Sequence, residues 1–320
     1  MASGATARVT AAVLTFEGRE LLDVVLPSLA AQRYSSFEAV VVDNGSTDGT
    51  SAWLAERWPA VEVIRLPENV GVTKALNVCL ESGGGELVAL LNNDVELDPG
   101  CLGELVGALD AHPDASVAAA KLIDFHDRDV IDGAGDVYEW TGEANRRGRG
   151  LADIGQYDDP RPIFGACGGA ALYRRSAVHA VGLFDEDLFA VYEDVDWSFR
   201  SQLMGFSARY VPSAIAYHMG GATIGPDITD FGLYQAWRNA IWVALKNYPS
   251  AAFVRHGHEL LLSQAHNLVW ARQTGRERIF LRAWRDALRS LPSVLRKRRL
   301  VQSSRTVGLR ELERVIGVDP

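Results

Sequence analysis

The chain has 320 residues, 48% of them apolar, and a formal net charge of −9 at pH 7. This is the composition of an ordinary soluble protein with enough apolar residues for a substantial core, in one large domain or two small ones. No apolar run approaches the roughly 18 residues needed to span a bilayer, and the first residues lack the charged-then-apolar order of a signal peptide. We therefore expect a cytoplasmic protein, either free or peripheral at the inner face of the cell membrane.

The three cysteines, Cys79, Cys101 and Cys167, argue against a disulfide framework. They are odd in number and lack the spacing of a metal site. We expect each of them to be a buried, reduced side chain.

The two ends of the chain differ in charge. Residues 254–320 contain 14 Lys and Arg against 6 Asp and Glu, a net of +8, whereas residues 1–253 contain 18 against 35, a net of −17. An acidic body with a basic C-terminal region indicates two different tasks. Because most of the chain is acidic and no nucleic-acid-binding module is recognised, we expect no nucleic-acid partner.

The first hundred residues alternate short apolar runs with segments of helical periodicity. Apolar, β-branched runs predict strands over residues 9–15, 38–42, 61–66 and 87–91. Apolar residues at helical spacing predict helices over residues 21–32, 50–57, 72–81 and 100–111. This alternation predicts an α/β fold, with a parallel sheet covered on both faces.

The rest of the chain is less regular. Gly-rich and charged residues over 124–162 predict a long irregular connection or a β-ribbon, and connections of that length are more often functional than idle. Further strands are expected over 170–173 and 208–211, and further helices over 176–182 and 194–204. From Leu233 onward the pattern is helical, with breaks at Pro249, Gly275 and Pro292.

Polar residues stand where three of the predicted strands end. They are Thr15-Phe16-Glu17 after the first strand, "DNGSTDGT" (43–50) after the second, and Asn92-Asn93-Asp94 after the fourth. Ligands of open α/β sheets bind outside the carboxyl ends of the strands. Each segment alone is also an ordinary turn sequence, but three of them at one edge predict a ligand site.

The residue types at these strand ends suit a nucleotide and a cation. An isolated acid on a rigid strand end suits a hard divalent cation, which prefers carboxylate oxygen and keeps positions open for phosphate oxygens. Asp94 is the candidate ligand, whereas Asn92 and Asn93 either shape the turn or contact a ribose. Asp43 is a candidate acceptor for the imide N–H of uracil or thymine.

Six segments together resemble family 2 glycosyltransferases. They are "DNGSTDGT" (43–50), "NVGVTKALN" (69–77), "LNNDVELDPG" (91–100), "GACGGAALYRR" (165–175), "GLFDEDLFAVYEDVDWSFR" (182–200) and "AYHMGGAT" (216–223). The resemblance spans about residues 9–245. The segment "YQAWRNAIWVALKNYP" (234–249) makes the chain most similar to the bacterial rhamnosyltransferase and galactofuranosyltransferase branch.

The resemblance implies a fold and a reaction. It implies a GT-A fold, which is a Rossmann-like, mostly parallel sheet flanked by helices, and an inverting transfer from a nucleotide diphosphate sugar. The implied catalytic domain covers residues 1–225, and a helical C-terminal region covers 226–320.

The resemblance also implies roles for individual residues. Around the nucleotide and the donor sugar it places Thr15, Phe16, Glu17, Asp43, Asn44, Lys74, Asn92, Asn93, Gly168 and Arg238. Asp94 matches the last acid of the family's Asp-x-Asp metal motif, in which Asn92 stands where an acid is common. His218, which would otherwise be expected as a surface or packed histidine, matches an additional metal ligand. The implied cofactor is Mn²⁺ or Mg²⁺.

Catalysis needs a base, because an acceptor hydroxyl is a poor nucleophile at neutral pH. The segment "YEDVDWSFR" offers Glu193, Asp194 and Asp196, which would also suit the start of a helix as capping charges. The resemblance assigns the base role to Asp194 and the orientation of acceptor hydroxyls to Glu193. Asp196 and Arg200, four residues apart, predict a structural ion pair.

Two further features concern the sugars. Trp140 and Trp197 are candidates for stacking on acceptor sugar rings. The small residues of "GACGGAA" (165–171) either let a ligand approach the backbone or serve tight strand packing.

Residues 277–299 predict a basic amphipathic helix. Its apolar stripe consists of Phe280, Trp284, Leu288, Leu291 and Leu295. Largely away from that stripe lie Arg278, Arg282, Arg285 and Arg289. Such a helix either lies on an anionic membrane, which would suit a polyprenyl-diphosphate-linked acceptor, or packs its stripe on the catalytic domain and leaves the arginines solvated.

The sequence therefore indicates an inverting glycosyltransferase that adds one sugar to a cell-surface glycan or its lipid-linked precursor. Rhamnosyl from a dTDP-sugar is the first expectation, and galactofuranosyl or another hexosyl from a UDP-sugar the second. A non-catalytic scaffold that binds nucleotide sugars is an alternative, against which Asp194 and His218 argue. A sugar nucleotidyltransferase would need a Gly-rich loop that "LTFEGRE" (14–20) does not supply. The sequence leaves a homo-oligomer open.

Overall fold

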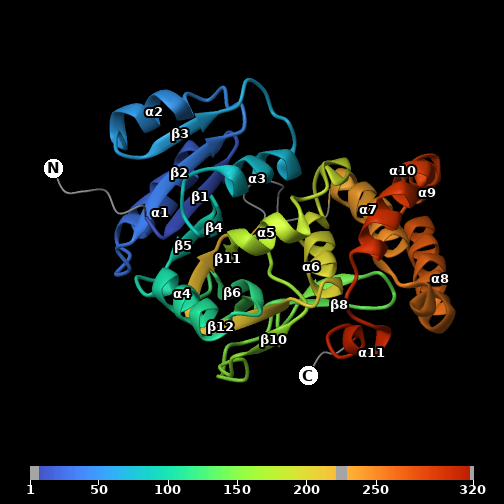
Figure 1. Ribbon diagram of the computed structural model, residues 1–320. Coiled ribbons are helices and arrows are strands. Elements are labelled where there is room, and N and C mark those ends of the chain that lie inside the picture. The colour runs from blue at the N-terminus through green and yellow to red at the C-terminus, as the bar shows by residue number, and fades with distance from the viewer. Residues whose placement is uncertain (1–6, 221–228, 318–320) are drawn as a thin grey trace.

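The computed structural model describes residues 7–220 and 229–317, so the last three residues of the predicted 216–223 segment lie outside the described residues (Figure 1). The centre of the protein is a mixed ten-stranded sheet. Its strand order is β10 (Arg161–Ile163), β12 (Ser207–His218), β6 (Ala115–Asp124), β11 (Ala170–Arg174), β4 (Leu87–Asn92), β1 (Val9–Thr15), β2 (Phe37–Asp43) and β3 (Glu62–Arg65). In addition, β5 (Val95–Leu97) pairs with β12 and β7 (Ile131–Gly133) with β6.

The predicted α/β class is confirmed. Strands β4, β1, β2 and β3 pair in parallel, and the chain passes between them through helices α1 (Arg19–Ala30), α2 (Thr50–Arg57) and α3 (Val72–Glu81). The remaining elements of the catalytic part are α4 (Cys101–Ala111), β8 (Asp136–Tyr138), β9 (Ala144–Arg146), α5 (Arg175–Val181), the 3₁₀ helix η1 (Glu186–Leu188) and α6 (Glu193–Leu203).

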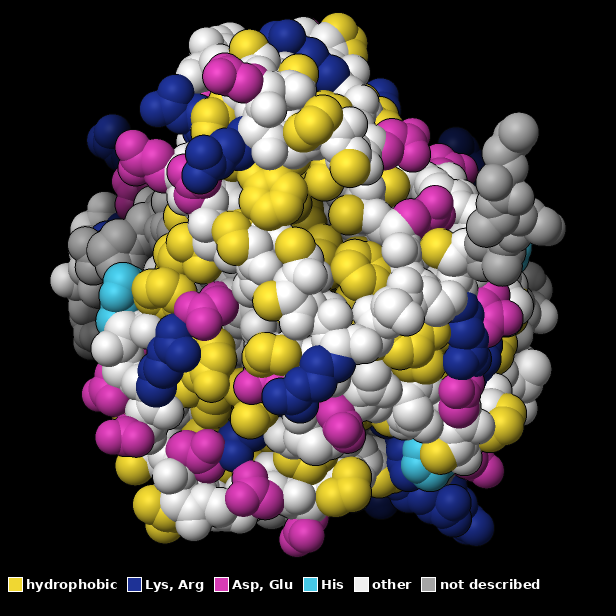
Figure 2. Space-filling model, turned by 90° about the vertical axis from the view of Figure 1, so that its left-hand side faces the viewer, with side chains coloured by type: hydrophobic (Ala, Val, Ile, Leu, Met, Phe, Trp, Pro, Cys, Tyr) yellow, Lys and Arg dark blue, Asp and Glu magenta, His cyan; other side chains and the backbone are white. Residues whose placement is uncertain are grey.

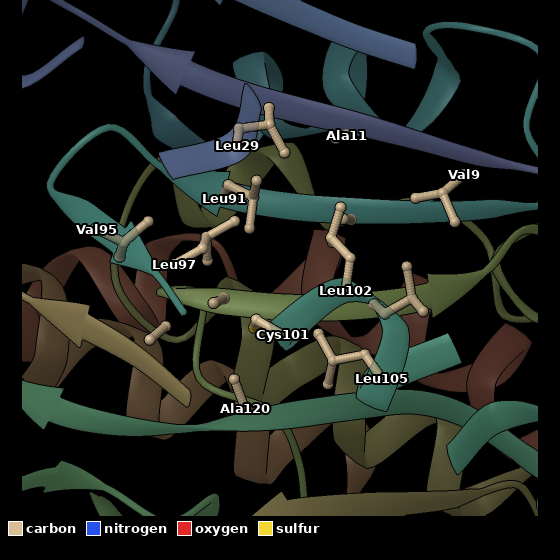
Figure 3. Close-up of a cluster of buried hydrophobic side chains, with 14 of the residues drawn as sticks. Val9, Ala11, Leu29, Leu91, Val95, Leu97, Cys101, Leu102, Leu105 and Ala120 are labelled. Carbon is tan, nitrogen blue, oxygen red and sulfur yellow. The ribbon is translucent and has the colours of Figure 1, made fainter. Parts of the chain in front are cut away.

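The sheet is covered on both faces by apolar cores. On one face, Leu29 of α1 and Leu102 and Leu105 of α4 pack on Val9 and Leu91 (Figure 3). On the other face, side chains of α3, α5 and α6 pack on the alternate residues of the same strands. Because successive strand side chains point to opposite faces, the apolar runs of β1 and β4 are buried on both sides.

The sequence analysis missed strand β6, which lies between β11 and β12. Its sequence "ASVAAAKLID" is nearly all buried but is rich in alanine, a good helix former, and shows no alternation of apolar and polar residues. It is a strand because β11 and β12 pair with it, which is a long-range effect that local sequence does not encode.

Strand β12 is longer than expected. The prediction ended it at 211, before Pro212, but the strand runs through an irregularity between Val211 and Ile215 and ends only at His218. Proline is tolerated at such bulges. The extension carries His218 to the edge of the sheet where β4 ends.

The connection over 124–162 contains the expected β-ribbon. β8 and β9 pair as an antiparallel hairpin, with Asp136 opposite Arg146. Strand β7 adds to the edge of β6.

The C-terminal region is helical, as predicted, and lies on the side of the molecule away from α1 and α2 (Figure 1). It consists of α7 (Asp230–Asn247), α8 (Ser250–Gln273), α9 (Glu277–Arg289), α10 (Leu291–Ser303) and α11 (Leu309–Leu312). In the parts of the chain that the structure describes, none of the helices combines the length and the apolarity that crossing a membrane requires.

The amphipathic helix α9 packs on the protein through the first half of its apolar stripe and through the neighbouring alanines. Phe280, Ala283 and Ala287 are buried, and the Phe280 ring lies 5.2 Å from that of Trp237 on α7. The packing alternative therefore holds for this half of the stripe. Leu288 and Leu295, by contrast, are 56% and 41% exposed.

Helices α6 and α7 are joined by a buried ion cluster. Asp196 is fully buried and accepts hydrogen bonds from Arg200 Nε at 2.9 Å and from Asn247 Nδ2 at 2.9 Å. Lys246 Nζ lies 2.7 Å from Asp196 Oδ1, the oxygen that also accepts from Asn247. The predicted Asp196–Arg200 ion pair is confirmed, and α7 supplies a second cation that the sequence did not indicate.

Charged side chains are interspersed on the opposite side of the molecule. Figure 2 shows this face, on which Lys and Arg alternate with Asp and Glu around a central group of hydrophobic side chains. The mixture contrasts with the basic surface of α9 and α10.

Candidate active site

The ends of β1 and β4 are tied together by polar side chains. Asn93 Nδ2 donates to Thr15 Oγ1 at 2.9 Å, and both residues are buried. A Cβ on Gly18 would lie only 2.2 Å from Asn93 Nδ2, so this position needs glycine. Asn93 therefore shapes the turn, whereas the half-buried Asn92 is held through its N–H, which donates to Gly169 O at 3.1 Å.

The loop after β2 is organised by Asp43. This buried carboxylate accepts hydrogen bonds from Ser46 N at 2.9 Å and from the Ser51 hydroxyl. Both oxygens thus stabilise their own loop. A contact between Asp43 and the imide of a base stays a prediction.

Glu17 cross-links the first strand end to the same loop. Its Oε1 accepts from Thr47 N at 2.8 Å and from Thr47 Oγ1 at 2.9 Å, and its own N–H donates to Ser46 Oγ at 2.9 Å. Glu17 has φ of 49°, a conformation that costs energy for a residue with a side chain. Phe16, beside it, is half-buried.

Asn44 fixes the start of α3. Its Oδ1 accepts from Val70 N at 3.0 Å, and its Nδ2 donates to Asn69 Oδ1 at 3.1 Å. Lys74, in the first turn of α3, is exposed. The structure thus brings the segments containing Thr15, Asn44 and Lys74 to one edge of the sheet.

Asp94 and His218 face each other at this edge. His218 Nε2 lies 3.3 Å from Asp94 Oδ1, and both side chains are almost completely buried. On the other side of the ring, Nδ1 lies 2.8 Å from Asp132 Oδ2. Because a carboxylate only accepts, Nδ1 carries a proton and Nε2 is the nitrogen presented to Asp94.

The pair fits a divalent cation. Asp94 Oδ1 is buried and makes no hydrogen bond within the described part of the chain. A neutral His218 would point a lone pair at this oxygen, so the space between them calls for a proton or a cation. Adjacent ligands of an octahedral ion with bonds of about 2.1 Å are separated by roughly 3 Å, close to the observed 3.3 Å.

The protein supplies few ligands to such a cation. Over residues 7–220 and 229–317, no group of three His, Cys, Asp or Glu side chains is arranged to hold a metal. A cation here would take its other ligands from water and from a diphosphate, as Mg²⁺ does in many nucleotide sites.

Burial lowers the pKa of His218, but the hydrogen bond to Asp132 and the nearby carboxylate of Asp94 outweigh that effect and raise the pKa to about 9. Without a cation, the imidazole is therefore protonated at neutral pH. A metal ion bound to Nε2 would take the place of that proton.

Asp194 and Glu193 lie at the N-terminus of α6, half-buried. Burial raises the pKa of Asp194, although the Val195 N–H, 2.8 Å from its Oδ1, and Arg146 favour the charged form. Burial and the charge of Asp194 raise the pKa of Glu193 to about 8. Glu193 is therefore mostly neutral at pH 7.

The dipeptide Gly168-Gly169 lies between Asp194 and the Asp94–His218 pair. A Cβ on Gly168 would lie 3.9 Å from Asp194 Oδ2, with no other atom of the described residues within 4 Å, so among these residues the backbone is open beside the carboxylate. A Cβ on Gly169 would lie 3.8 Å from the His218 ring. Asp194 therefore stands one dipeptide away from the candidate cation site.

Other parts of the "GACGGAA" segment serve packing. A Cβ on Gly165 would lie 2.3 Å from Ser198 Oγ of α6. Cys167 is half-buried rather than buried as expected, because it lies in the open Gly-rich segment, and burial raises the pKa of its thiol to about 12. Cys79 and Cys101 are buried and free, as expected.

Three residues of the 124–162 connection belong to the site and were missed by the sequence analysis: Asp132, Asp136 and Arg146. Arg146 forms an ion pair with Asp132, and its Nη1 lies 3.4 Å from His218 Nδ1. Burial, together with the charge of Asp194, raises the pKa of Asp136 well above its ordinary value. The length of this connection was the only signal for them.

Two predicted acceptor contacts are wrong. Trp197 is fully buried between Tyr173 and Phe184 and donates from Nε1 to Gly182 O at 2.9 Å. Trp140 is 5% exposed and stacks on His256 at 4.4 Å. Neither ring has a face available for a sugar, because core packing covers both.

Arg238 lies on α7 and turns toward the segment before α6. Its Nη2 donates to Leu188 O at 2.9 Å, its Nε donates to Asn239 Oδ1 at 2.9 Å, and its guanidinium lies over the Trp242 ring. A direct contact between Arg238 and a donor stays a prediction.

Comparisons with known proteins identify the family of this chain. Residues 10–182 match the family model described as Glycosyl transferase family 2. An N-acetylglucosaminyl-diphospho-decaprenol L-rhamnosyltransferase of Mycobacterium tuberculosis is 29% identical over 236 residues, which are 67% of this chain and 76% of that protein. An N-acetylglucosaminyltransferase of Rhizobium leguminosarum bv. viciae is 28% identical over 244 residues, which are 68% of this chain and 51% of that protein.

Solved structures show the same fold. A mannosyltransferase, PcManGT from Pyrobaculum calidifontis in complex with GDP-Man and Mn²⁺, superposes with a TM-score of 0.58 at 19% identity and covers 93% of this chain and 85% of that one. At this identity the likeness concerns the fold alone.

Proposed function

Because the chain belongs to glycosyl transferase family 2, we propose that it catalyses an inverting transfer of rhamnosyl from a dTDP-sugar to a hydroxyl of a lipid-linked glycan precursor. One observation carries this proposal: Asp194 stands one dipeptide, Gly168-Gly169, away from the Asp94–His218 pair. The site therefore combines a base with a place for a diphosphate and its cation.

The side chains divide the work of a single displacement. Asp194 takes the proton of the acceptor hydroxyl, whose oxygen then attacks the anomeric carbon from the face opposite the leaving nucleoside diphosphate. Glu193, neutral at pH 7, orients the acceptor by hydrogen bonding. When bound, the cation supplies electrostatic stabilisation of the charge on the leaving diphosphate. Asp94 and His218 would hold it.

The donor preference is supported by the relatives. The Mycobacterium tuberculosis relative is named a rhamnosyltransferase, and its name includes an N-acetylglucosaminyl-diphospho-decaprenol acceptor. The Rhizobium leguminosarum relative is named an N-acetylglucosaminyltransferase, which supports transfer of another hexosyl group as the second candidate. Mn²⁺ in the PcManGT complex supports a divalent cation as cofactor.

The acceptor chemistry suggests contact with an anionic membrane at its cytoplasmic face. On α9, Arg282, Arg285 and Arg289 are each more than half exposed and share the single carboxylate of Asp286. Leu288, beside them, is exposed as well. A surface with three arginines to one carboxylate and an exposed leucine has the chemistry of a peripheral membrane site.

Calorimetric titration of UDP and dTDP, each with and without Mn²⁺, tests the proposal. We expect Mn²⁺-dependent binding of one nucleotide, lost in Asp94→Ala and retained in Asp194→Ala, with transfer abolished in Asp194→Ala. Nucleotide binding by a folded wild type that transfers no sugar to any supplied acceptor would favour the scaffold. Wild-type transfer rates in both variants would refute the site.

A further inference from the structure

The segment that leads into the catalytic helix is held in an unfavourable backbone conformation. Phe189, Val191 and Tyr192 have φ of 65°, 66° and 74°, and Glu17 is the one other non-glycine residue with positive φ over residues 7–220 and 229–317. Residues with side chains rarely adopt this region, and β-branched ones such as valine least of all. Strain of this kind persists only where the surroundings impose it, and it clusters at functional sites.

The carbonyl groups of this segment are taken by donors from other elements. Arg238 Nη2 donates to Asp187 O and Leu188 O at 3.3 and 2.9 Å. Asn239 Nδ2 contacts Leu188 O, Ala190 O and Val191 O at 3.1, 3.0 and 2.6 Å. Thr73 N donates to Phe189 O at 3.0 Å. Each backbone carbonyl of residues 187–191 therefore accepts a hydrogen bond from another element.

The side chain of Asn239 is held in one orientation by its surroundings. It is fully buried, and its Oδ1 accepts from Arg238 Nε at 2.9 Å, which directs the two amide N–H groups toward the segment. The guanidinium of Arg238 is in turn stacked over Trp242 at 4.4 Å. An amide so fixed is a rigid support, because neither its position nor its orientation can change without breaking buried hydrogen bonds.

The segment determines where Asp194 stands. Helix α6 has no side-chain N-cap, and its N-cap residue, Tyr192, has left-handed backbone geometry. The start of the helix, and with it Glu193 and Asp194, therefore follows from the path of the strained segment rather than from a local capping interaction.

The opposite side of the segment touches the nucleotide edge of the sheet. A Cβ on Gly71 would lie 2.6 Å from the Phe189 ring, and Gly71 belongs to the turn that Asn44 holds. The strained segment is thus wedged between α7 and the start of α3.

We propose that Asn239, supported by Arg238, is a positioning residue for Asp194: its amide holds the strained segment 189–192 and so fixes the base beside Gly168. This inference rests on the proposed base role of Asp194. It assigns Asn239 an effect on the chemical step and none on nucleotide binding, because the two amide N–H groups of Asn239 are directed at the strained segment and not at the strand ends that carry Thr15 and Asp94.

The test compares Asn239→Ala with Gln235→Ala. Gln235 is a matched control because it lies on the same helix, is 3% exposed and has an Oε1 without a hydrogen bond among the described residues. For Asn239→Ala we expect kcat to fall about 100-fold, the scale of a misplacement of about 1 Å, while KM for the donor and Mn²⁺-dependent nucleotide affinity stay within about twofold. Gln235→Ala should keep the wild-type kcat.

A second variant separates positioning from general loosening. Glycine adopts positive φ without cost, so Val191→Gly should let the segment keep its path when the support is gone. We expect Val191→Gly/Asn239→Ala to recover at least about tenfold in kcat over Asn239→Ala. If the alanine variant does not fold, Asn239→Ser, which keeps one donor, replaces it.

The outcomes distinguish the two proposals. A kcat of Asn239→Ala within about threefold of wild type, an equal loss in Gln235→Ala, or no recovery in the double variant overturns the positioning role. Asp194→Asn is measured alongside. If it transfers sugar at the wild-type rate, the proposed base itself is wrong; if it is inactive while Asn239→Ala is normal, only the positioning role fails.

Discussion

His218 Nδ1 lies 2.8 Å from Asp132 Oδ2, and this contact fixes the ring so that Nε2 faces Asp94. Histidines that bind metals usually donate their second ring N–H to a carboxylate or carbonyl, which sets the tautomer and raises the basicity of the ligating nitrogen. Arg146 in turn holds Asp132. The 124–162 connection thus supplies the outer support of the candidate cation site.

Asp132→Asn should weaken Mn²⁺ binding roughly 10- to 100-fold, because the ring loses the carboxylate that orients it. Electron paramagnetic resonance of free Mn²⁺ in the presence of nucleotide measures this directly. Asp129→Asn, an exposed acid of the same connection, serves as the control. Equal Mn²⁺ affinity in Asp132→Asn and wild type would show that Asp132 does not support a metal ligand.

The pH dependence of kcat/KM should reflect the ionisation of Asp194. A base works only when deprotonated, so kcat/KM should fall as pH decreases through the pKa of Asp194, which burial raises above the ordinary 3.8. A profile of kcat/KM against pH tests this. An acidic limb at or below the ordinary aspartate value would contradict the assignment.

Glu193→Gln should resemble the wild type at pH 7. With a pKa of about 8, Glu193 is mostly neutral there, and glutamine copies a neutral hydrogen-bonding group of similar size. We expect kcat within about threefold of wild type for glutamine and a larger loss for Glu193→Ala, since a general acid–base or orienting contact contributes on the order of 100-fold or more. Equal losses in both variants would indicate that the ionised carboxylate is needed.

Lys246→Ala should destabilise the protein by about 3–5 kcal/mol, because it leaves the fully buried Asp196 with one cation fewer. Urea unfolding followed by circular dichroism measures the change. The control is Arg272→Ala, which breaks a surface pair with Glu277 and should cost less than about 1 kcal/mol. Similar losses in the two variants would show that the ion pair between Lys246 and Asp196 contributes no more to stability than an exposed ion pair.

The surface of α9 should bind anionic vesicles. Arg285→Glu/Arg289→Glu should reduce sedimentation with phosphatidylserine-containing vesicles roughly tenfold or more, at about 1 kcal/mol per arginine near the surface. Arg33→Glu/Arg57→Glu makes the same change in net charge at exposed positions near the far ends of α1 and α2. If both double variants lose binding equally, net charge rather than this surface is responsible.

Local sequence determined the strand and helix alternation of the first hundred residues. Helices α2 and α3 begin and end where their apolar spacing predicts, and β1 does as well. The polar strand ends carrying Thr15, Asp43 and Asp94 were also evident, because an apolar run that ends in Asn and Asp is a local pattern. The ordered motifs then led from these residues to the glycosyltransferase family.

Tertiary structure decided what local patterns leave open. The Ala-rich β6 is a strand because β11 and β12 pair with it, and β12 continues past Pro212 because β5 and β6 bind its second half and so deliver His218. Burial of Trp140 and Trp197 is likewise a matter of what packs on them. Asp132, Asp136 and Arg146 join the site, and Asn239 reaches the segment before Asp194, only when the chain is folded. Most of these contacts link positions more than 45 residues apart, and their free energy comes from neighbours that no local window of sequence contains.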